Sequence, residues 1–258
     1  MNLSSYQADV RDLLRDDNGQ FYSTAKINRY INRARYQVAL QTGCIRVLAA
    51  GAAAAGSDST VGVGTVGGII PGQVGNANDL STSVFSTIAG QERYPYSFAN
   101  SFVQSQNAGV KGVVDVYNVA VSWGGNKPAM SWMPWQDLQA YARSITNGTT
   151  SYPVVFSKYQ EGESGQVWLF PVPSIATEME WDCCCVPVPL VNDTTPEAIP
   201  QPYTNAVRFY AAKLAYFSSQ RFGMAEIMEE EFQKHMMTDA AAVNTGAVPN
   251  YYYADDSW

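Results

Sequence analysis

Charged residues are scarce in this chain of 258 residues: they make up 15% of it, whereas hydrophobic residues make up 46%. The 16 basic and 23 acidic side chains give a net charge of −7, and no run of Lys or Arg occurs. An acidic chain without a basic patch lacks the phosphate-neutralising surface of a nucleic-acid binder. A surface poor in charge is typical of a chain that buries itself against partners, although a β-rich domain with a polar, uncharged surface has the same composition.

Histidine is almost absent, since His235 is the only one. Nucleophilic catalysis by Ser or Cys would depend on this residue as the base. It lies on a predicted helix beside Phe232 and Met236, where packing is the commoner role. A second candidate, the carboxylate pair Glu161 and Glu163, lies at a glycine-containing hairpin tip, where charge is ordinary turn chemistry. We therefore predict no catalytic residue.

Cysteine is also rare, and its spacing is unsuited to a cross-linked or metal-binding framework. Cys44 stands alone, and Cys183, Cys184 and Cys185 are consecutive, so the three cannot all pair with the one. A zinc site usually needs cysteines two to four residues apart together with a second pair or histidines. We interpret the triplet as small apolar residues in a strand, and we predict no metal site.

The chain also lacks a secretory signal at its start and any apolar stretch long enough to span a bilayer. Together with the reduced thiols, this indicates assembly in a cytoplasm without a membrane partner. One glycine-rich stretch, Gly62–Gly67, has the spacing of a dinucleotide-binding loop. Its flanks are loop-like rather than a strand and a helix, so we expect no cofactor.

Helical periodicity is confined to the two ends of the chain. Residues 3–42 carry it in two segments separated by a turn, and Gly43 is well suited to end the second segment. Residues 203–243 carry it again. Because a short amphipathic helix cannot bury its apolar stripe alone, we expect the first helical pair to pack against the last.

The middle of the chain has the alternation and the turn residues of β-structure. In residues 177–186, apolar residues such as Trp181 alternate with acidic ones such as Asp182, which predicts a strand with one buried and one wet face. Further strands are expected at 84–89, 112–123, 154–159 and 166–170, and a short helix at 135–144.

The sequence thus predicts an α+β fold, in which a helical bundle formed by both termini carries an inserted antiparallel β-sandwich or barrel-like domain. The expected parts are a helical hairpin at 1–43, an inserted β domain at 44–200 with a Gly/Ala-rich loop at 49–80, returning helices at 201–243, and an extended C-terminal arm at 244–258.

The C-terminal arm is rich in aromatic residues, which a tail without a partner usually lacks. Tyr and Trp are the typical anchors of protein interfaces. We interpret the arm as a peptide that docks on another subunit through Tyr251, Tyr252, Tyr253 and Trp258. Packing of the arm on its own chain is the alternative.

Several segments, in order along the chain, resemble tailed-bacteriophage head-to-tail adaptor (connector) proteins. The two N-terminal segments resemble the helical hairpin of that family, and the later ones resemble the strands and the returning helix of its β and helical parts. The segments are Leu3–Asp16, Tyr22–Ala34, Gly90–Pro95, Val167–Pro173, Met179–Trp181 and Ile199–Phe217. The glycine-rich stretch departs from the compact versions of the family.

The resemblance implies a structural protein of the virion, assembled in the host cytoplasm, that joins the capsid to the tail. Such adaptors form a ring, commonly of twelve copies, beneath the portal protein, and genomic DNA passes through the ring without being read. The helical part packs between neighbours and against the portal, the β part faces the tail, its nozzle or its fibres, and a C-terminal arm often reaches the portal. An acidic channel would repel DNA phosphates and avoid trapping the genome.

On this basis we expect the four aromatic residues of the arm to dock on the portal. For the seam between copies we expect arginines of the first helices to pair with glutamates of the last one. The residues are Arg11, Arg15, Arg29 and Arg33 on one side and Glu229, Glu230 and Glu231 on the other. The simpler interpretation is that both groups lie on helix faces exposed to solvent. Arg35 lies among these arginines in the sequence and is interpreted in the same way.

Another class of function stays open from the residues alone. The six tryptophans could stack on sugar rings in a carbohydrate-binding or tail-spike-type host-recognition protein. A capsid or baseplate component of unrelated fold is a third possibility.

Overall fold

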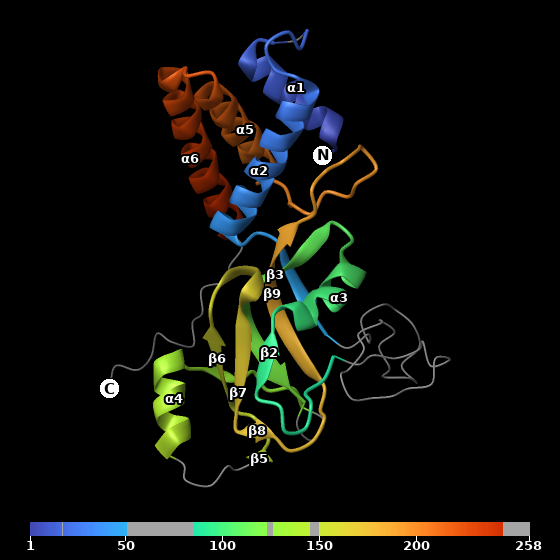
Figure 1. The fold of residues 1–258 in the computed structure, drawn as a ribbon, viewed down its shortest axis with the longest axis vertical. Coiled ribbons are helices and arrows are strands. Elements are labelled where there is room, and N and C mark those ends of the chain that lie inside the picture. The colour runs from blue at the N-terminus through green and yellow to red at the C-terminus, as the bar shows by residue number, and fades with distance from the viewer. Residues whose placement is uncertain (17, 51–84, 123–125, 145–149, 245–258) are drawn as a thin grey trace. The chain divides into compact units, whose positions relative to one another are not determined.

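The computed structural model describes residues 1–16, 18–50, 85–122, 126–144 and 150–244 (Figure 1). These described residues divide into two compact units: those within 1–44 and 189–244 form the helical unit, and those within 45–188 form the β unit. The chain is mixed α+β, as the sequence predicts. The predicted loop at 49–80 is described only at its first two residues, where Ala49 ends a strand and is not part of a loop, and the arm predicted at 244–258 is described only at Asn244, which ends a helix. The rest of both segments lies outside the described residues.

The described residues of the helical unit form four helices, and local capping is seen at the start of the first and at the end of the second. Asn2 accepts a hydrogen bond from the Ser5 backbone N–H at 3.0 Å and so starts the first helix. Gly43, with a φ of 59°, ends the second as the sequence predicts, because a residue without Cβ tolerates this conformation. The helices are α1 (Leu3–Leu14), α2 (Thr24–Thr42), α5 (Thr204–Ser218) and α6 (Phe222–Asn244).

Helix α5 is the central element of the helical unit, where it contacts α1, α2 and α6. It buries the small side chains Ala206, Ala211, Ala212 and Ala215, which allow neighbouring backbones to approach closely. The Tyr216 hydroxyl donates a 2.8 Å hydrogen bond to the carbonyl oxygen of Leu13 at the end of α1. Helices from both ends of the chain are therefore packed together in one unit.

The turn between α1 and α2 is held by a buried carboxylate. Asp16 is 3% exposed and accepts hydrogen bonds from the backbone N–H groups of Gln20, Phe21 and Tyr22 at 2.8, 3.2 and 2.9 Å. Burial opposes ionisation, but these three donors and the nearby Arg11 outweigh it, so the pKa of Asp16 is lowered.

The segment after residue 188 is tied to α2. The Asn32 side chain donates to the Leu190 carbonyl at 3.0 Å and accepts from the Leu190 N–H at 2.7 Å. Arg35, which the sequence places on a solvated basic face, is instead fully buried and paired with Glu197. Residues 189–200, assigned from the sequence to the β domain, thus belong to the helical unit.

The β unit contains three sheets. The first has the order β1-β9-β3 and is antiparallel, and the second has the order β2-β7-β6-β4, with β4 parallel to β6. The third pairs β5 with β8 in parallel. The strands are β1 (Arg46–Ala49), β2 (Arg93–Pro95), β3 (Val110–Val121), β4 (Ser131–Trp132), β5 (Thr150–Ser151), β6 (Val155–Tyr159), β7 (Gln166–Phe170), β8 (Val172–Pro173) and β9 (Met179–Pro187).

The barrel-like form predicted from the sequence is wrong, because the described strands do not close into a barrel. Each sheet ends in edge strands, and several of these are only two or three residues long. The hairpin of β6 and β7 and the strand β9 lie where the sequence predicts them. The short 3-10 turn Gly162–Ser164 lies between β6 and β7.

Two helices accompany the sheets. Helix α4 (Trp135–Ser144) has the predicted bounds, and it packs on β6 and β7 through Trp135, whose ring lies 4.2 Å from that of Trp168. Helix α3 (Ser97–Gln106) was not predicted. It lies against β3 and brings Phe102 within 4.8 Å of Phe85 in the aromatic core around Trp181, which is 0% exposed.

Strict alternation fails in two of the strands. Strand β3 has three register shifts against β9, so Val116 is buried while Tyr117, which strict alternation would place on the same face as the buried Val113 and Val119, is 46% exposed. In β9 the predicted wet face holds for Glu180 and Asp182 but ends at Cys184, which packs with Val114 and Val186.

Candidate assembly surface

The side chains considered for chemistry have structural roles. His235 stacks on Phe209 with ring centroids 4.7 Å apart, and Glu163 pairs with Lys111 near the hairpin tip. Burial raises the pKa of the Cys185 thiol to about 12 and raises that of Cys183 as well, which keeps these thiols protonated and unreactive. Within the described ranges, no cluster of three or more His, Cys, Asp or Glu side chains could hold a metal ion.

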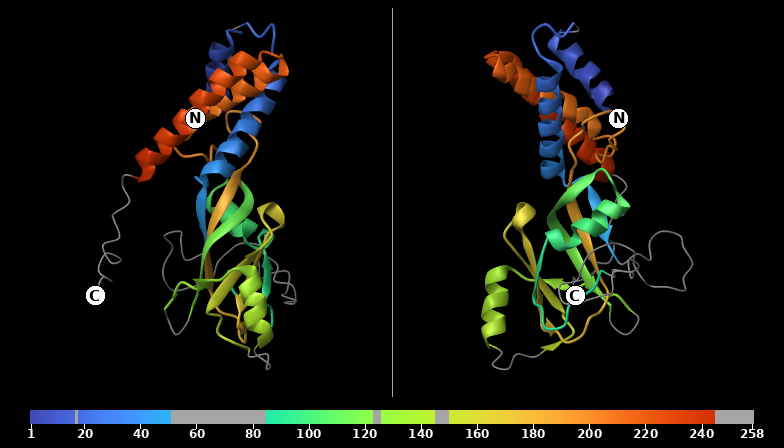
Figure 2. Two further views of the ribbon diagram at one scale, coloured as in Figure 1. Left: turned by 90° about the vertical axis from the view of Figure 1, so that its left-hand side faces the viewer. Right: turned by 45° about the vertical axis from the view of Figure 1, so that its right-hand side comes forward.

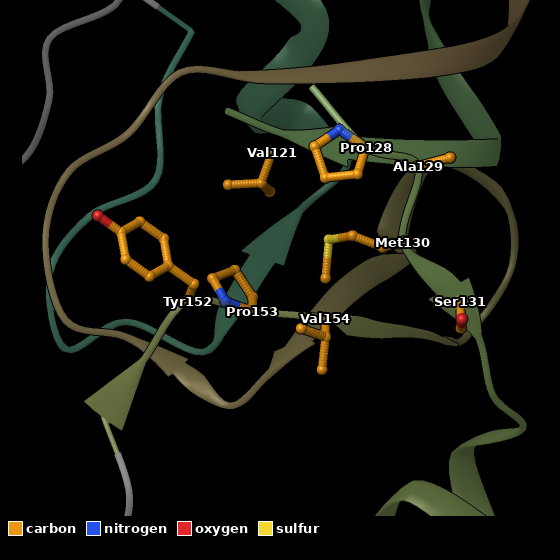
Figure 3. A pocket seen from close by; sticks show the side chains of 8 residues that line it. All are labelled: Val121, Pro128, Ala129, Met130, Ser131, Tyr152, Pro153 and Val154. Atoms are coloured by element: carbon orange, nitrogen blue, oxygen red, sulfur yellow. The ribbon is translucent and has the colours of Figure 1, made fainter. Parts of the chain in front are cut away.

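A pocket of about 320 Å³ lies in the β unit (Figure 3). Its lining is apolar except for one Ser and the hydroxyl of one Tyr, and it contains no charged side chain. Such a lining offers packing but supplies neither an acid, a base nor an anion-binding group. The lining residues are Val121, Pro128, Ala129, Met130, Ser131, Tyr152, Pro153 and Val154.

Large apolar side chains are exposed at one end of the helical unit. The Tyr22 hydroxyl reaches the Ser219 hydroxyl at 2.8 Å, which places the α1–α2 turn beside the C-terminal end of α5. Figures 1 and 2 show this turn and the α5–α6 turn at the same end of the unit. We call the exposed apolar residues of these turns and of the start of α6 the helical tip: Phe21, Phe217, Phe222, Met224 and Ile227, whose exposed fractions run from 42% to 75%.

Arginines flank the helical tip. Arg15 and Arg221 are exposed, and both lie close enough to Tyr216 to oppose the rise in its pKa that burial causes. Among the described residues neither arginine has an ion-pair partner within 4.0 Å. We call Arg15 and Arg221 the basic rim of the tip, and the exposed Glu226 lies next to Ile227 in the sequence. The two arginines suit acidic groups on a partner surface that has an apolar centre.

The tip was missed from the sequence for a simple reason. Phe217, Met224 and Ile227 lie in the helical segment 203–243, whose apolar residues were expected to pack against the first helical pair. Helix α5 buries its four alanines together with Val207, Phe209 and Tyr216, whereas Phe217 at the end of the helix is left 61% exposed, with its ring 5.3 Å from that of Phe222. A cluster of aromatic residues on both sides of a tight turn was the available signal.

The arginines proposed for the seam lie in different settings. Arg11 is hydrogen-bonded within its own chain, since its guanidinium donates to the Asp16 carbonyl at 3.2 Å and to the Thr24 hydroxyl at 3.1 Å. Arg15 lies at the end of α1, and Arg29 and Arg33 are exposed on α2.

The proposed glutamates differ in the same way. Glu229 pairs with Lys213 at 2.6 Å and Glu231 with Lys234 at 3.4 Å, whereas Glu230 is exposed. No pair between the four arginines and these glutamates occurs among the described residues of one chain, and a contact between copies stays a prediction. The arm residues Tyr251, Tyr252, Tyr253 and Trp258 lie outside the described residues.

The described tryptophans offer little free surface for stacking on sugars. Trp181 and Trp168 are buried, and Trp135 is packed between Trp168 and Tyr159. Trp132 is 58% exposed. A row of exposed indole rings is therefore not formed by these four residues.

Comparison with known proteins assigns the chain to a family. None of the described helices combines the length and the apolar character that a bilayer crossing requires. A comparison with curated proteins gives no match. Residues 1–252 match the SU10 adaptor protein family, and the chain therefore belongs to this family of phage head-to-tail adaptors.

Proposed function

We propose that the chain forms a closed ring of twelve copies beneath the portal protein. This ring joins the capsid to the tail and lets DNA pass. The observation that carries this proposal is the helical tip with its basic rim, since five large apolar side chains at one end of a unit are a typical protein-binding surface. A structural adaptor of the virion needs such surfaces and no catalytic group, cofactor or metal.

In this arrangement the helical tip faces the portal, and the β unit faces the tail, its nozzle or its fibres. The arm at 244–258 adds a second contact with the portal through its three tyrosines and its tryptophan. Two contacts on one partner raise the effective concentration of each for the other, so a ring can attach firmly through individually modest surfaces. The acidic chain also suits a channel that DNA must leave quickly.

Association of the full chain with purified portal protein tests the proposal. We expect the two proteins to form a ring-on-ring complex that is visible by electron microscopy. The substitutions Phe217→Ser and Phe222→Ser should abolish the complex without changing the melting temperature much, because both side chains are largely exposed.

A matched control is Trp132→Ser, which removes an equally exposed aromatic residue from the β unit. It should leave portal binding unchanged. Wild-type protein that never associates with portal protein would overturn the proposed function, and glycan binding in its place would favour the carbohydrate-binding alternative.

A further inference from the structure

Two faces of the helical unit carry complementary rows of side chains. The buried face of α2 includes Ile27, Ile31 and Val38, and its opposite face carries Arg29, Arg33, Tyr36 and Leu40 in solvent. The outer face of α6 carries Glu226, Glu230 and Met237 in solvent. Tyr36, Leu40 and Met237 are 38%, 45% and 72% exposed. Each row thus combines two like charges with exposed apolar surface.

The order of side chains is the same in both rows. Arg29 and Arg33 are four residues apart and Leu40 follows seven residues later, and Glu226, Glu230 and Met237 repeat this spacing. Two charges one turn apart lie about 6 Å from each other along a helix axis. Long side chains at that spacing can meet their partners at either of the common helix crossing angles.

Neither charged pair is neutralised within its own chain. Among the described residues, Arg29, Arg33, Glu226 and Glu230 take part in none of the ion pairs within 4.0 Å. Like charges at positions i and i+4 repel each other and weaken a free helix. A partner of opposite charge would relieve both repulsions, one on each helix.

The two rows lie on different helices with α5 between them. Helix α5 contacts both α2 and α6. Helices α2 and α6 run in the same direction, from the end of the unit that carries the α1–α2 and α5–α6 turns toward its other end (Figures 1 and 2). Contact of either face with its own copy would place like charges together. A contact of α2 on one copy with α6 on the next places opposite charges together and can repeat around a ring.

We propose that the outer face of α2 binds the outer face of α6 of a neighbouring copy of this chain. Arg29 and Arg33 meet Glu226 and Glu230, while Leu40 and Met237 extend the contact with apolar surface. This inference rests on the proposed ring and names its seam. It keeps two of the arginines and one of the glutamates expected from the sequence, and it replaces the internally paired Glu229 and Glu231 with Glu226.

Charge reversal with complementation tests the seam. The first variant carries Arg29→Glu and Arg33→Glu, and the second carries Glu226→Arg and Glu230→Arg. We expect each variant alone to lose ring formation in sedimentation velocity and electron microscopy, performed with portal protein as the template. An equimolar mixture should restore rings, because the altered α2 then meets the altered α6 and the two unaltered faces meet each other.

Matched controls separate the seam from general effects. The mixture has the average charge of the wild type, so restored rings cannot result from a change in net charge. Arg29→Lys with Arg33→Lys should still form rings, and circular dichroism should show all variants folded.

Three outcomes would overturn the inference, the first two by excluding the seam and the third by excluding the ring. Rings that persist in both single variants, or a mixture that stays unassembled, would exclude this seam while leaving the ring intact. Wild-type protein that forms no ring with or without portal protein would overturn the proposed function together with the seam.

Discussion

Arg35 on α2 and Glu197 in the segment that leads to α5 form a buried, bidentate ion pair. The Nη2 and Nε atoms of Arg35 lie 2.7 and 3.0 Å from Oε1 and Oε2 of Glu197. The arginine side chain is 0% exposed and the glutamate side chain 7%. Glu197 also accepts from the backbone N–H of Ile199 at 3.0 Å. The pair thus fixes the segment before α5 against the first helical pair.

Replacing Glu197 by Ala should destabilise the helical unit by about 3–5 kcal/mol, because the substitution removes the carboxylate that neutralises the buried Arg35 charge. The measurement is chemical denaturation followed by circular dichroism. The double variant Arg35→Met with Glu197→Leu should recover most of the loss, since two apolar side chains leave no charge to compensate. A single variant as stable as the wild type would show that water reaches Arg35.

Asp16 should make stability depend on pH. Its pKa is lower in the folded chain than in the unfolded one, so its contribution is present above the unfolded pKa of about 4 and is lost as the pH falls through the folded value. Thermal unfolding of the wild type and of Asp16→Asn should therefore differ most at neutral pH. The difference should shrink below pH 4, and a difference independent of pH would contradict this role of the carboxylate.

Trp181→Ala should destabilise the β unit by about 3–5 kcal/mol, because it removes the largest fully buried side chain of the aromatic core. Near-ultraviolet circular dichroism during denaturation would report the loss. Trp181→Phe should cost less, since an aromatic ring still meets Phe85, whose centroid lies 5.2 Å from that of Trp181. A negligible effect of both changes would place the indole outside the cooperative core.

Deleting residues 249–258 should weaken attachment to the portal while the melting temperature stays unchanged. The reason is that the deletion removes the four aromatic anchors of the arm but none of the described helices or strands. Binding to immobilised portal protein measures the effect. A second variant keeps the full length of the chain and combines Tyr251→Ser, Tyr252→Ser and Tyr253→Ser, so that it separates the loss of the aromatic side chains from the shortening of the arm. Unchanged binding in both variants would exclude the arm as a portal contact.

Local signals in the sequence predicted local structure well. Gly43 marks the end of α2, and the bounds of α4 follow from its periodicity and its flanking residues. The glycine-containing turn between β6 and β7 made their pairing predictable. In each case the information lies within about ten residues of the feature.

Features that depend on distant partners were not predictable in this way. Helix α3 has few charges and a narrow apolar stripe, and it is stabilised by the aromatic core that residues far along the chain complete. The bulges of β3 are imposed by pairing with β9 and reverse the expected side of Tyr117. The buried Arg35 is a charge whose partner lies 162 residues away.

The candidate surface shows the same limit. The sequence offered arginines and glutamates as candidates for the seam, yet it could not distinguish Arg11, which is hydrogen-bonded within its own chain, from Arg29, which faces solvent. The distinction requires knowing which face of each helix is covered, and this depends on how α5 packs against α1, α2 and α6.

The helical unit draws its helices from both ends of the chain, and this has a consequence for synthesis on the ribosome. Helices α1 and α2 emerge first, but α5, which packs against both, follows only after the whole β unit has been translated. At typical translation rates of about 5–20 residues per second, this delay lasts roughly 10–30 s. During that interval the apolar surface of α1 and α2 stays exposed on the nascent chain. The β unit can therefore fold before the helical unit is complete. We expect chaperones to bind the first 44 residues until α5 has been synthesised.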